Sequence, residues 1–219
     1  MMEVYKPFHQ DMTHDEAVAY LKSFAFWCRY QTEGLIDSRA IFVAVRSLMC
    51  DFDFLGALYG GFDGSDTAKK QNRFRFLRLF REVVARATNN HASGKYAPHL
   101  YDSSRVGSVH LGTPRRLTNP NNSTPILTWS LLPSQDGVAE QDHDGRPILL
   151  AHLQTVRQNP KTVVLPICVP RLFEDFNTTC EFFAGLLQTE KTEGGCSLLE
   201  RWRLTALVLA TPEPSRARW

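Results

Sequence analysis

The chain has 219 residues, of which 43% are hydrophobic and 22% charged, and its net charge is +2. These values are typical of one soluble globular domain that buries a sizeable core, and the small net charge does not by itself indicate a nucleic-acid partner. The longest apolar runs, such as 41–45, are too short to cross a membrane, and residues 1–10 lack the apolar stretch of a signal peptide. Five cysteines without a CxxC pair predict reduced thiols in a cytoplasmic protein.

The N-terminal part of the chain has the pattern of two long helices. Thr13 and Glu16 have the spacing of a capping box, and apolar residues follow at helical spacing up to Gly34, where we expect the helix to end. A second helix is expected over 38–59, with Asp37 as its cap. Because its first half is apolar almost all round, this helix is predicted to be central and buried.

A third helix is expected over 67–87, and it concentrates positive charge. Between 69 and 86 there are seven basic residues and a single acidic one, Glu82. Such a stripe is either a solvated face or an anion-binding surface. If the protein binds RNA, this helix would carry the affinity, because its charges replace the counterions of the phosphates. The residues expected to contact RNA are Arg75, Arg78 and Arg81.

A loop is expected over 89–98, followed by a fourth helix over 98–110 that a Gly and a Pro bring to an end. This helix holds Arg105 and His110. Arg binds a phosphate in a bidentate manner and His transfers protons near neutral pH, so the pair suits phosphodiester chemistry. The alternative is that Arg105 lies on the surface and His110 borders a helix end.

A second pair with the same spacing, Arg86 and His91, is expected to lie across a helix end. We interpret that pair as a coincidence.

The segment 115–168 changes to turn-forming residues and short β-like runs. Three strands are expected, over 126–132, 147–150 and 162–168, as a small hairpin or sheet inserted between helices. Within this segment, residues 142–145 read Asp-His-Asp-Gly, which suits either a turn or a metal site. The turn is favoured because the ligands of an EF-hand loop are missing. Helices are expected again over 170–189 and 197–210.

The run 100–110, which holds Arg105 and His110, resembles the signature of HEPN-type proteins, a family of helical domains with an Arg-x4–6-His motif in a late helix. The run 50–59 and the 170–176 helix after a strand are similar to uncharacterised bacterial members of that family.

The resemblance implies a mostly α-helical, HEPN-like bundle that forms one domain over residues 1–219. Its helical core would comprise about 13–112 and 170–210, and a β-containing insertion would comprise about 115–168.

Active HEPN-type proteins resemble metal-independent endoribonucleases, so the resemblance implies RNA cleavage without a metal or another cofactor. His110 would act as general acid or base and Arg105 would stabilise charge on the phosphoryl oxygens. Many members lack nuclease activity, and Val106 stands where many nucleases of the family have a polar residue. A non-catalytic helical dimer that binds protein or nucleic acid therefore stays open, as does a third alternative, a helical protein that binds a small molecule in its aromatic interior.

Helix geometry adds a condition to the catalytic hypothesis. Positions five apart lie ~140° apart around a helix, so Arg105 and His110 do not share one helix face. Either Gly107 permits a distortion, or two copies of the chain pool their residues across a twofold axis. The second arrangement is how active members of the family are built, so we expect a homodimer through the 98–111 helix. The small residues beside Arg105 would allow close approach of two helices, either between copies or within one chain.

Overall fold

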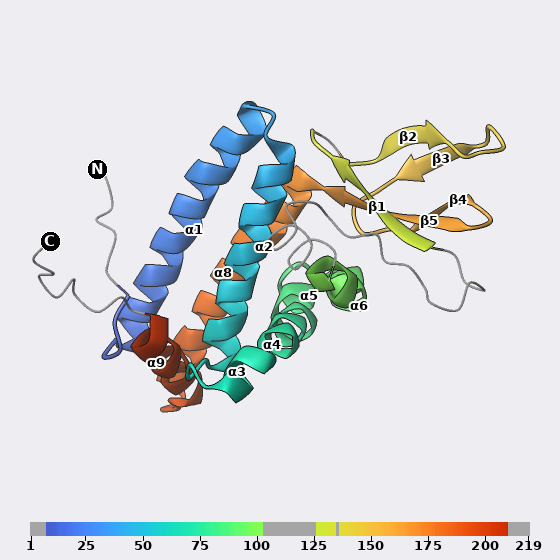
Figure 1. The fold of residues 1–219 in the computed structure, drawn as a ribbon. Helices are drawn as coiled ribbons and strands as arrows, with labels where there is room; N and C mark the ends of the chain where they lie inside the picture. The colour runs from blue at the N-terminus through green and yellow to red at the C-terminus, as the bar shows by residue number, and fades with distance from the viewer. Residues whose placement is uncertain (1–7, 103–125, 135, 210–219) are drawn as a thin grey trace, which may run out of the picture.

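The computed structural model describes residues 8–102, 126–134 and 136–209, and it is mostly helical with a small β region (Figure 1). The helical elements are α1 (His14–Asp37), α2 (Ile41–Gly60), α3 (Asp66–Lys70), α4 (Asn72–Leu79), the π-helix η1 (Phe80–Val84), α5 (Ala85–Ala87), α6 (His91–His99), α8 (Val169–Thr192) and α9 (Ser197–Leu209). The strands are β1 (Ile126–Leu132), β2 (Val138–Gln141), β3 (Pro147–Leu150), β4 (Val156–Asn159) and β5 (Thr162–Cys168).

The long helices α1, α2 and α8 lie side by side, and α9 crosses one end of this bundle (Figure 1). Aromatic side chains fill the space between them. Trp202 of α9 is fully buried, and its ring contacts those of Phe8, Tyr20 and Phe183 at centroid distances of 5.9, 5.8 and 5.8 Å. Burying a side chain of this size stabilises the fold by roughly 1.5–3 kcal/mol or more, so this group of aromatic rings is part of the core.

The first helix begins as predicted, with both hydrogen bonds of the Thr13–Glu16 capping box in place. It does not end at Gly34 but continues to Asp37, so Asp37 is its last residue and not the cap of α2. The turn between the two helices is made by Arg39, whose φ is +60° and whose N–H donates to the carbonyl of Ile36. Because this turn occupies residues 38–40, α2 begins three residues later than expected.

The basic helix expected over 67–87 is four shorter elements in the structure, α3, α4, η1 and α5, with a break at Gln71. Close contact with α2 accounts for the position of α4. A Cβ atom placed on Gly56 of α2 would lie 3.3 Å from the backbone of Arg75 and Phe76, so a larger residue there would push the two helices apart by a few tenths of an ångström.

The prediction of a loop over 89–98 is wrong, because α6 occupies His91–His99. Asn90 caps this helix: its side-chain oxygen accepts a hydrogen bond from the N–H of Ala92 at 3.0 Å. Pro98 lies inside α6, and residues 100–102 continue it as a π-helical turn. The remainder of the helix expected over 98–110, with Arg105 and His110, lies outside the described residues.

The β region extends from the end of the bundle where α8 begins (Figure 1). All three expected strands are confirmed, as β1, β3 and β5, and two further strands, β2 and β4, were not expected. β5 is the central strand of a three-stranded sheet, with β1 parallel on one side and β4 antiparallel on the other, while β2 and β3 form a separate hairpin. Since β5 runs directly into α8, the sheet is covalently continuous with the helical bundle.

Candidate nucleic-acid interface

The residues just before the Arg105–His110 segment pack against α4. Leu100 and Tyr101 are buried, and the ring of Tyr101 meets that of Phe76 edge-on at 5.1 Å. These contacts hold the end of α6 against the inner face of the basic element α4.

An ion pair at the surface continues this contact. Nε of Arg73 donates to Oδ1 of Asp102 and Nη2 donates to Oδ2, both at 2.9 Å, which is the bidentate geometry of a strong charge-assisted pair. The hydrogen bond with Asp102 raises the pKa of Arg73. Burial lowers the pKa of the neighbouring His99, an effect that the charge of Asp102 opposes. A cation, a carboxylate and an imidazole therefore meet at the point where the chain enters the motif segment.

Arg75, the first of the three expected RNA contacts, points into the protein and is only 5% exposed. Its stem packs on Gly60, where a Cβ atom would lie 2.7 Å from Cγ of the arginine. Its guanidinium lies over the ring of Phe62 at 4.9 Å and donates to Oδ1 of Asn72. Burial lowers the pKa of Arg75. This arginine does not belong to the outer surface of the basic helix.

Arg78 is half-buried and takes part in an ion-pair network. Its Nε lies 3.0 Å from Oε2 of Glu82, and its guanidinium lies over the ring of Tyr59 at 5.4 Å. The hydroxyl of Tyr59 donates to the same carboxylate at 2.8 Å. The charge of Arg78 is therefore largely balanced within the protein.

Arg81 is exposed and lies against α6 at Gly94, where a Cβ atom would be 3.3 Å from its Cα. The next residue, Lys95, is exposed too. Together with Arg73, which is about half exposed, Arg81 and Lys95 are the basic residues of α4, η1 and α6 that the structure places at the surface near the motif segment. The sequence pattern missed Lys95 because its segment was expected to be a loop.

The second Arg/His pair lies across a helix end, as expected, although His91 is in a helix and not in the expected loop. Arg86 is in α5, where its guanidinium lies over the ring of Phe182 at 5.3 Å, and His91 is the first residue of α6.

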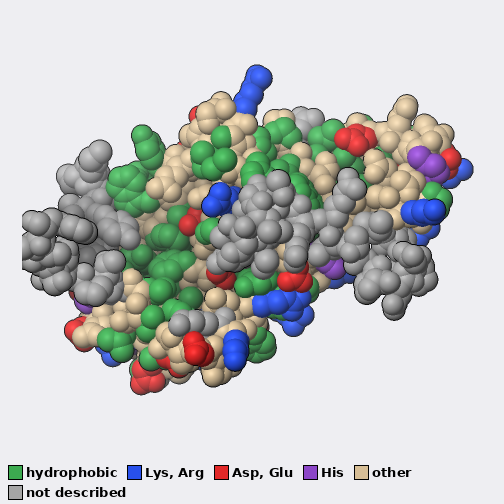
Figure 2. Space-filling view, in the orientation of Figure 1, with side chains coloured by type: hydrophobic (Ala, Val, Ile, Leu, Met, Phe, Trp, Pro, Cys, Tyr) green, Lys and Arg blue, Asp and Glu red, His purple; other side chains and the backbone are tan. Residues whose placement is uncertain are grey.

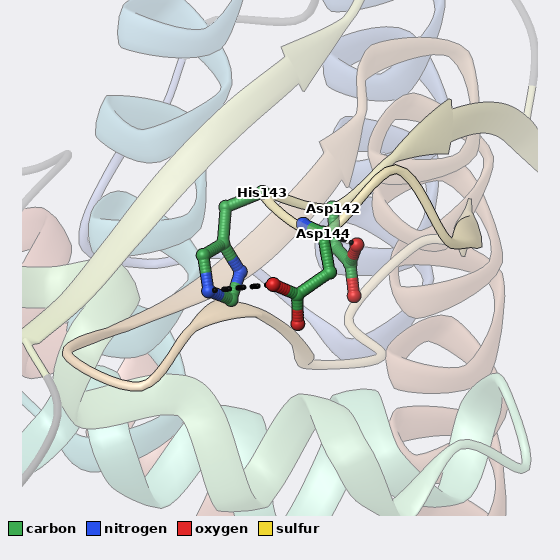
Figure 3. A group of neighbouring side chains, drawn as sticks. All are labelled: Asp142, His143 and Asp144. Carbon is green, nitrogen blue, oxygen red and sulfur yellow. Dashed lines mark hydrogen bonds and ion pairs between the residues drawn. The ribbon is translucent and has the colours of Figure 1, made fainter.

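The Asp-His-Asp-Gly sequence forms the turn between β2 and β3, so the turn prediction is confirmed (Figure 3). Oδ1 of Asp142 accepts hydrogen bonds from the backbone N–H groups of Asp144 and Arg146, and the bond from Arg146 lowers the pKa of Asp142. His143 uses Nδ1 to bond the carbonyl of Gln158 at 3.1 Å. One ligand atom each from Asp142, His143 and Asp144 lies within 4.8 Å of the others. The hydrogen bonds give the first two residues a role in the fold: Asp142 shapes the turn of the hairpin, and His143 joins that turn to β4.

A buried His–Asp pair that the sequence pattern did not indicate joins the β region to α8. Nε2 of His152 lies 3.3 Å from Oδ2 of Asp175, and Nδ1 accepts a hydrogen bond from the N–H of Cys168 at 3.0 Å. Because Nδ1 accepts, Nε2 carries the proton and donates to Asp175. Burial raises the pKa of the Cys168 thiol. Both ring nitrogens are used and the thiol is not activated, so this pair is a structural link and not a nucleophile with its base.

Comparison with known proteins yields no relative: no family model, no curated protein and no solved structure matches the chain. Within 8–102, 126–134 and 136–209, none of the helices combines the length and the apolar character that crossing a membrane requires.

Proposed function

We propose that the chain is a HEPN-like RNA-binding protein that cleaves RNA without a metal ion, with Arg105 and His110 contributed by two copies of the chain. The observation that supports this most is the bidentate ion pair between Arg73 and Asp102. It ties the basic element α4 to the residue that precedes Arg105 by three positions. RNA held on the adjoining elements η1 and α6 would thus lie near the start of the segment that supplies the reactive groups.

The two side chains have distinct roles in this proposal. His110 removes the proton of an RNA 2′-hydroxyl or protonates the leaving oxygen, for which an imidazole is suited near neutral pH. Arg105 donates hydrogen bonds to the phosphoryl oxygens as their negative charge grows. Attack by the 2′-hydroxyl leaves products that end in a cyclic or a 3′ phosphate.

The proposed RNA-backbone contacts are Arg81 and Lys95. Both are exposed, on η1 and α6, and both can replace counterions of the phosphate chain. The three arginines of α4 do not belong to this set, because Arg75 is buried while Arg73 and Arg78 are paired with Asp102 and Glu82.

The alternative is a non-catalytic helical dimer that binds protein or nucleic acid. It is favoured by the inward orientation of Arg75 and the internal pairing of Arg78, which leave less positive charge at the surface than the sequence indicates. Val106 also supports it, since many nucleases of the family have a polar residue there.

Cleavage of single-stranded RNA separates the two functions. His110→Ala should reduce the rate by about 100-fold or more, the usual contribution of a general acid or base, with little change in melting temperature. Arg105→Lys keeps the charge but loses the planar fork, so it should be severely impaired as well. Activity should persist in EDTA. Wild-type rates for His110→Ala, or activity that chelation abolishes, would contradict the mechanism.

Two controls complete this experiment. The double variant Arg86→Ala, His91→Ala should cleave normally, because neither residue has a role in the proposed RNA binding or cleavage. Arg81→Glu with Lys95→Glu should weaken RNA binding and reduce its dependence on salt, whereas Arg29→Glu on α1 should leave both unchanged. RNA binding without cleavage by the wild-type protein would leave the non-catalytic alternative in place.

A further inference from the structure

A cavity of about 280 Å³ lies between the second half of α2 and the start of α4, and Leu209 of α9 contributes to its wall. Phe54 and Phe62 supply further apolar surface, while Asn72 and Arg75 supply polar groups. Pockets for small molecules have this combination of a mostly apolar lining and a few convergent polar groups, and the volume of this one is slightly below their usual range. In the view of Figure 2, hydrophobic side chains gather over the surface that α1 and α2 form.

The polar wall of the cavity is built around a buried cation. Arg75 is 5% exposed, yet its guanidinium remains charged because arginine does not lose its proton in proteins. Three contacts fix it in place: its stem packs on Gly60, its guanidinium lies over Phe62, and it donates one hydrogen bond to Asn72.

Among the described residues, Arg75 makes no ion pair with a carboxylate, and the charges of Asp53 and Asp63 only partly offset the effect of its burial. A buried charge without a direct counterion is costly, so an anion in the cavity would be stabilised there. The guanidinium has five N–H donors and the bond to Asn72 uses one of them.

We propose that this cavity binds a small organic monocarboxylate with a compact apolar group. The carboxylate would accept hydrogen bonds from Arg75 and from the side-chain N–H₂ of Asn72, whose oxygen is already bonded to the arginine. The apolar group would contact Phe54 and Leu209. A phosphate dianion fits less well, because Asp53 is part of the same wall and repels two negative charges about twice as strongly as the single charge of a carboxylate.

The carboxylate has two sources, a free acid or an acidic side chain of the chain itself, such as Glu213 after α9. We propose the free acid, and benzoate is the probe. Ligand-observed NMR and calorimetry with the full chain should detect saturable binding of benzoate but not of benzamide, its neutral isostere. Arg75→Lys should weaken binding by roughly tenfold or more, which corresponds to about 1.4 kcal/mol.

Ala57→Phe is the second variant, because Ala57 also lines the cavity and a phenyl ring there would fill it. It should abolish binding of benzoate while the circular dichroism spectrum stays unchanged. If Arg75→Lys does not fold, this second variant still tests whether the cavity is the binding site. Arg86→Lys, which alters another arginine over a ring, should bind benzoate normally.

Three results would overturn the proposal. The first is no binding of benzoate by the wild-type protein, and the second is equal binding of benzamide. The third is binding of benzoate by Glu213→Gln alone, which would identify the chain's own carboxylate as the occupant.

Discussion

The helical body and the β region differ in how much apolar material each buries. The body has one large cluster of buried side chains that draws on α1, α2, α4, η1, α6, α8 and α9. Within the described residues, the β region has a separate cluster of three buried side chains, Leu132, Leu150 and Cys168. Small sheets need more apolar contact than this for independent stability. The comparison indicates that the β region depends on the body for its stability.

Two features supply that support. One face of β5 packs on the body, since Leu165 and Ile167 belong to the large cluster. The His152–Asp175 pair then joins the loop before β4 to α8, and the His152 ring also holds the N–H of Cys168 at the end of β5. If this support is what stabilises the β region, damage to the body should unfold both regions and damage to the pair should loosen one.

The largest effect is expected for Trp202→Ala in the body. Removing this fully buried ring should lower the free energy of unfolding by about 3–5 kcal/mol. Because the β region depends on the body, amide hydrogens of β1 and β5 should lose protection together with those of α8. Leu207→Ala, a change at a 61% exposed side chain, should stay within about 0.5 kcal/mol of the wild type. A β region that keeps its protection in Trp202→Ala would contradict the dependence.

Asp51→Asn, also in the body, is expected to raise the free energy of unfolding at pH 7.5, whereas Trp202→Ala lowers it. Burial raises the pKa of Asp51 to about 6, and a hydrogen bond with Cys28 partly opposes the shift. The folded state therefore holds this proton more tightly than the unfolded state, whose pKa is about 3.9. The stabilisation is complete below about pH 4 and is lost as the pH rises through about 6.

Asp51→Asn should therefore be more stable than the wild type at pH 7.5 by about 2–3 kcal/mol, the equivalent of a shift of about two pKa units. At pH 4 the two proteins should have similar stabilities. Urea unfolding across this pH range measures the difference. If the free energy of unfolding of the variant depended on pH as that of the wild type does, the dependence would come from other groups and the prediction would be wrong.

The smallest and most local effect is expected for His152→Ala. It leaves the buried carboxylate of Asp175 and the N–H of Cys168 without their partner, at a cost of about 1–3 kcal/mol. Hydrogen exchange should increase in β3, β4 and β5 more than in α1 and α2. Glu140→Ala, at an exposed position of the hairpin strand β2, provides the matched control and should have little effect. Uniform loss of protection in both regions would show that the pair stabilises the whole molecule.

Short-range patterns determined several features of this protein. The capping box forms from Thr13 and Glu16 alone, because its hydrogen bonds join residues three apart. The strands β1, β3 and β5 have the predicted bounds, since an apolar run between turn formers has few other stable conformations. β2 and β4, in contrast, have four residues each, of which two in β2 and three in β4 are polar, and each becomes a strand only through its partner, β3 or β5.

Tertiary contacts decided the candidate sites. A stripe of basic residues in the sequence does not show which arginine faces inward. Gly56 and Gly60 of α2 decide it, because they let α4 approach closely enough to bury Arg75. The ion pair between Arg73 and Asp102 spans 29 positions, and the His152–Asp175 pair spans 23. Helical or strand periodicity relates residues only a few positions apart, so it determines which face of an element is apolar. Which polar groups meet across two elements depends on how closely those elements pack, and only the folded chain determines that distance.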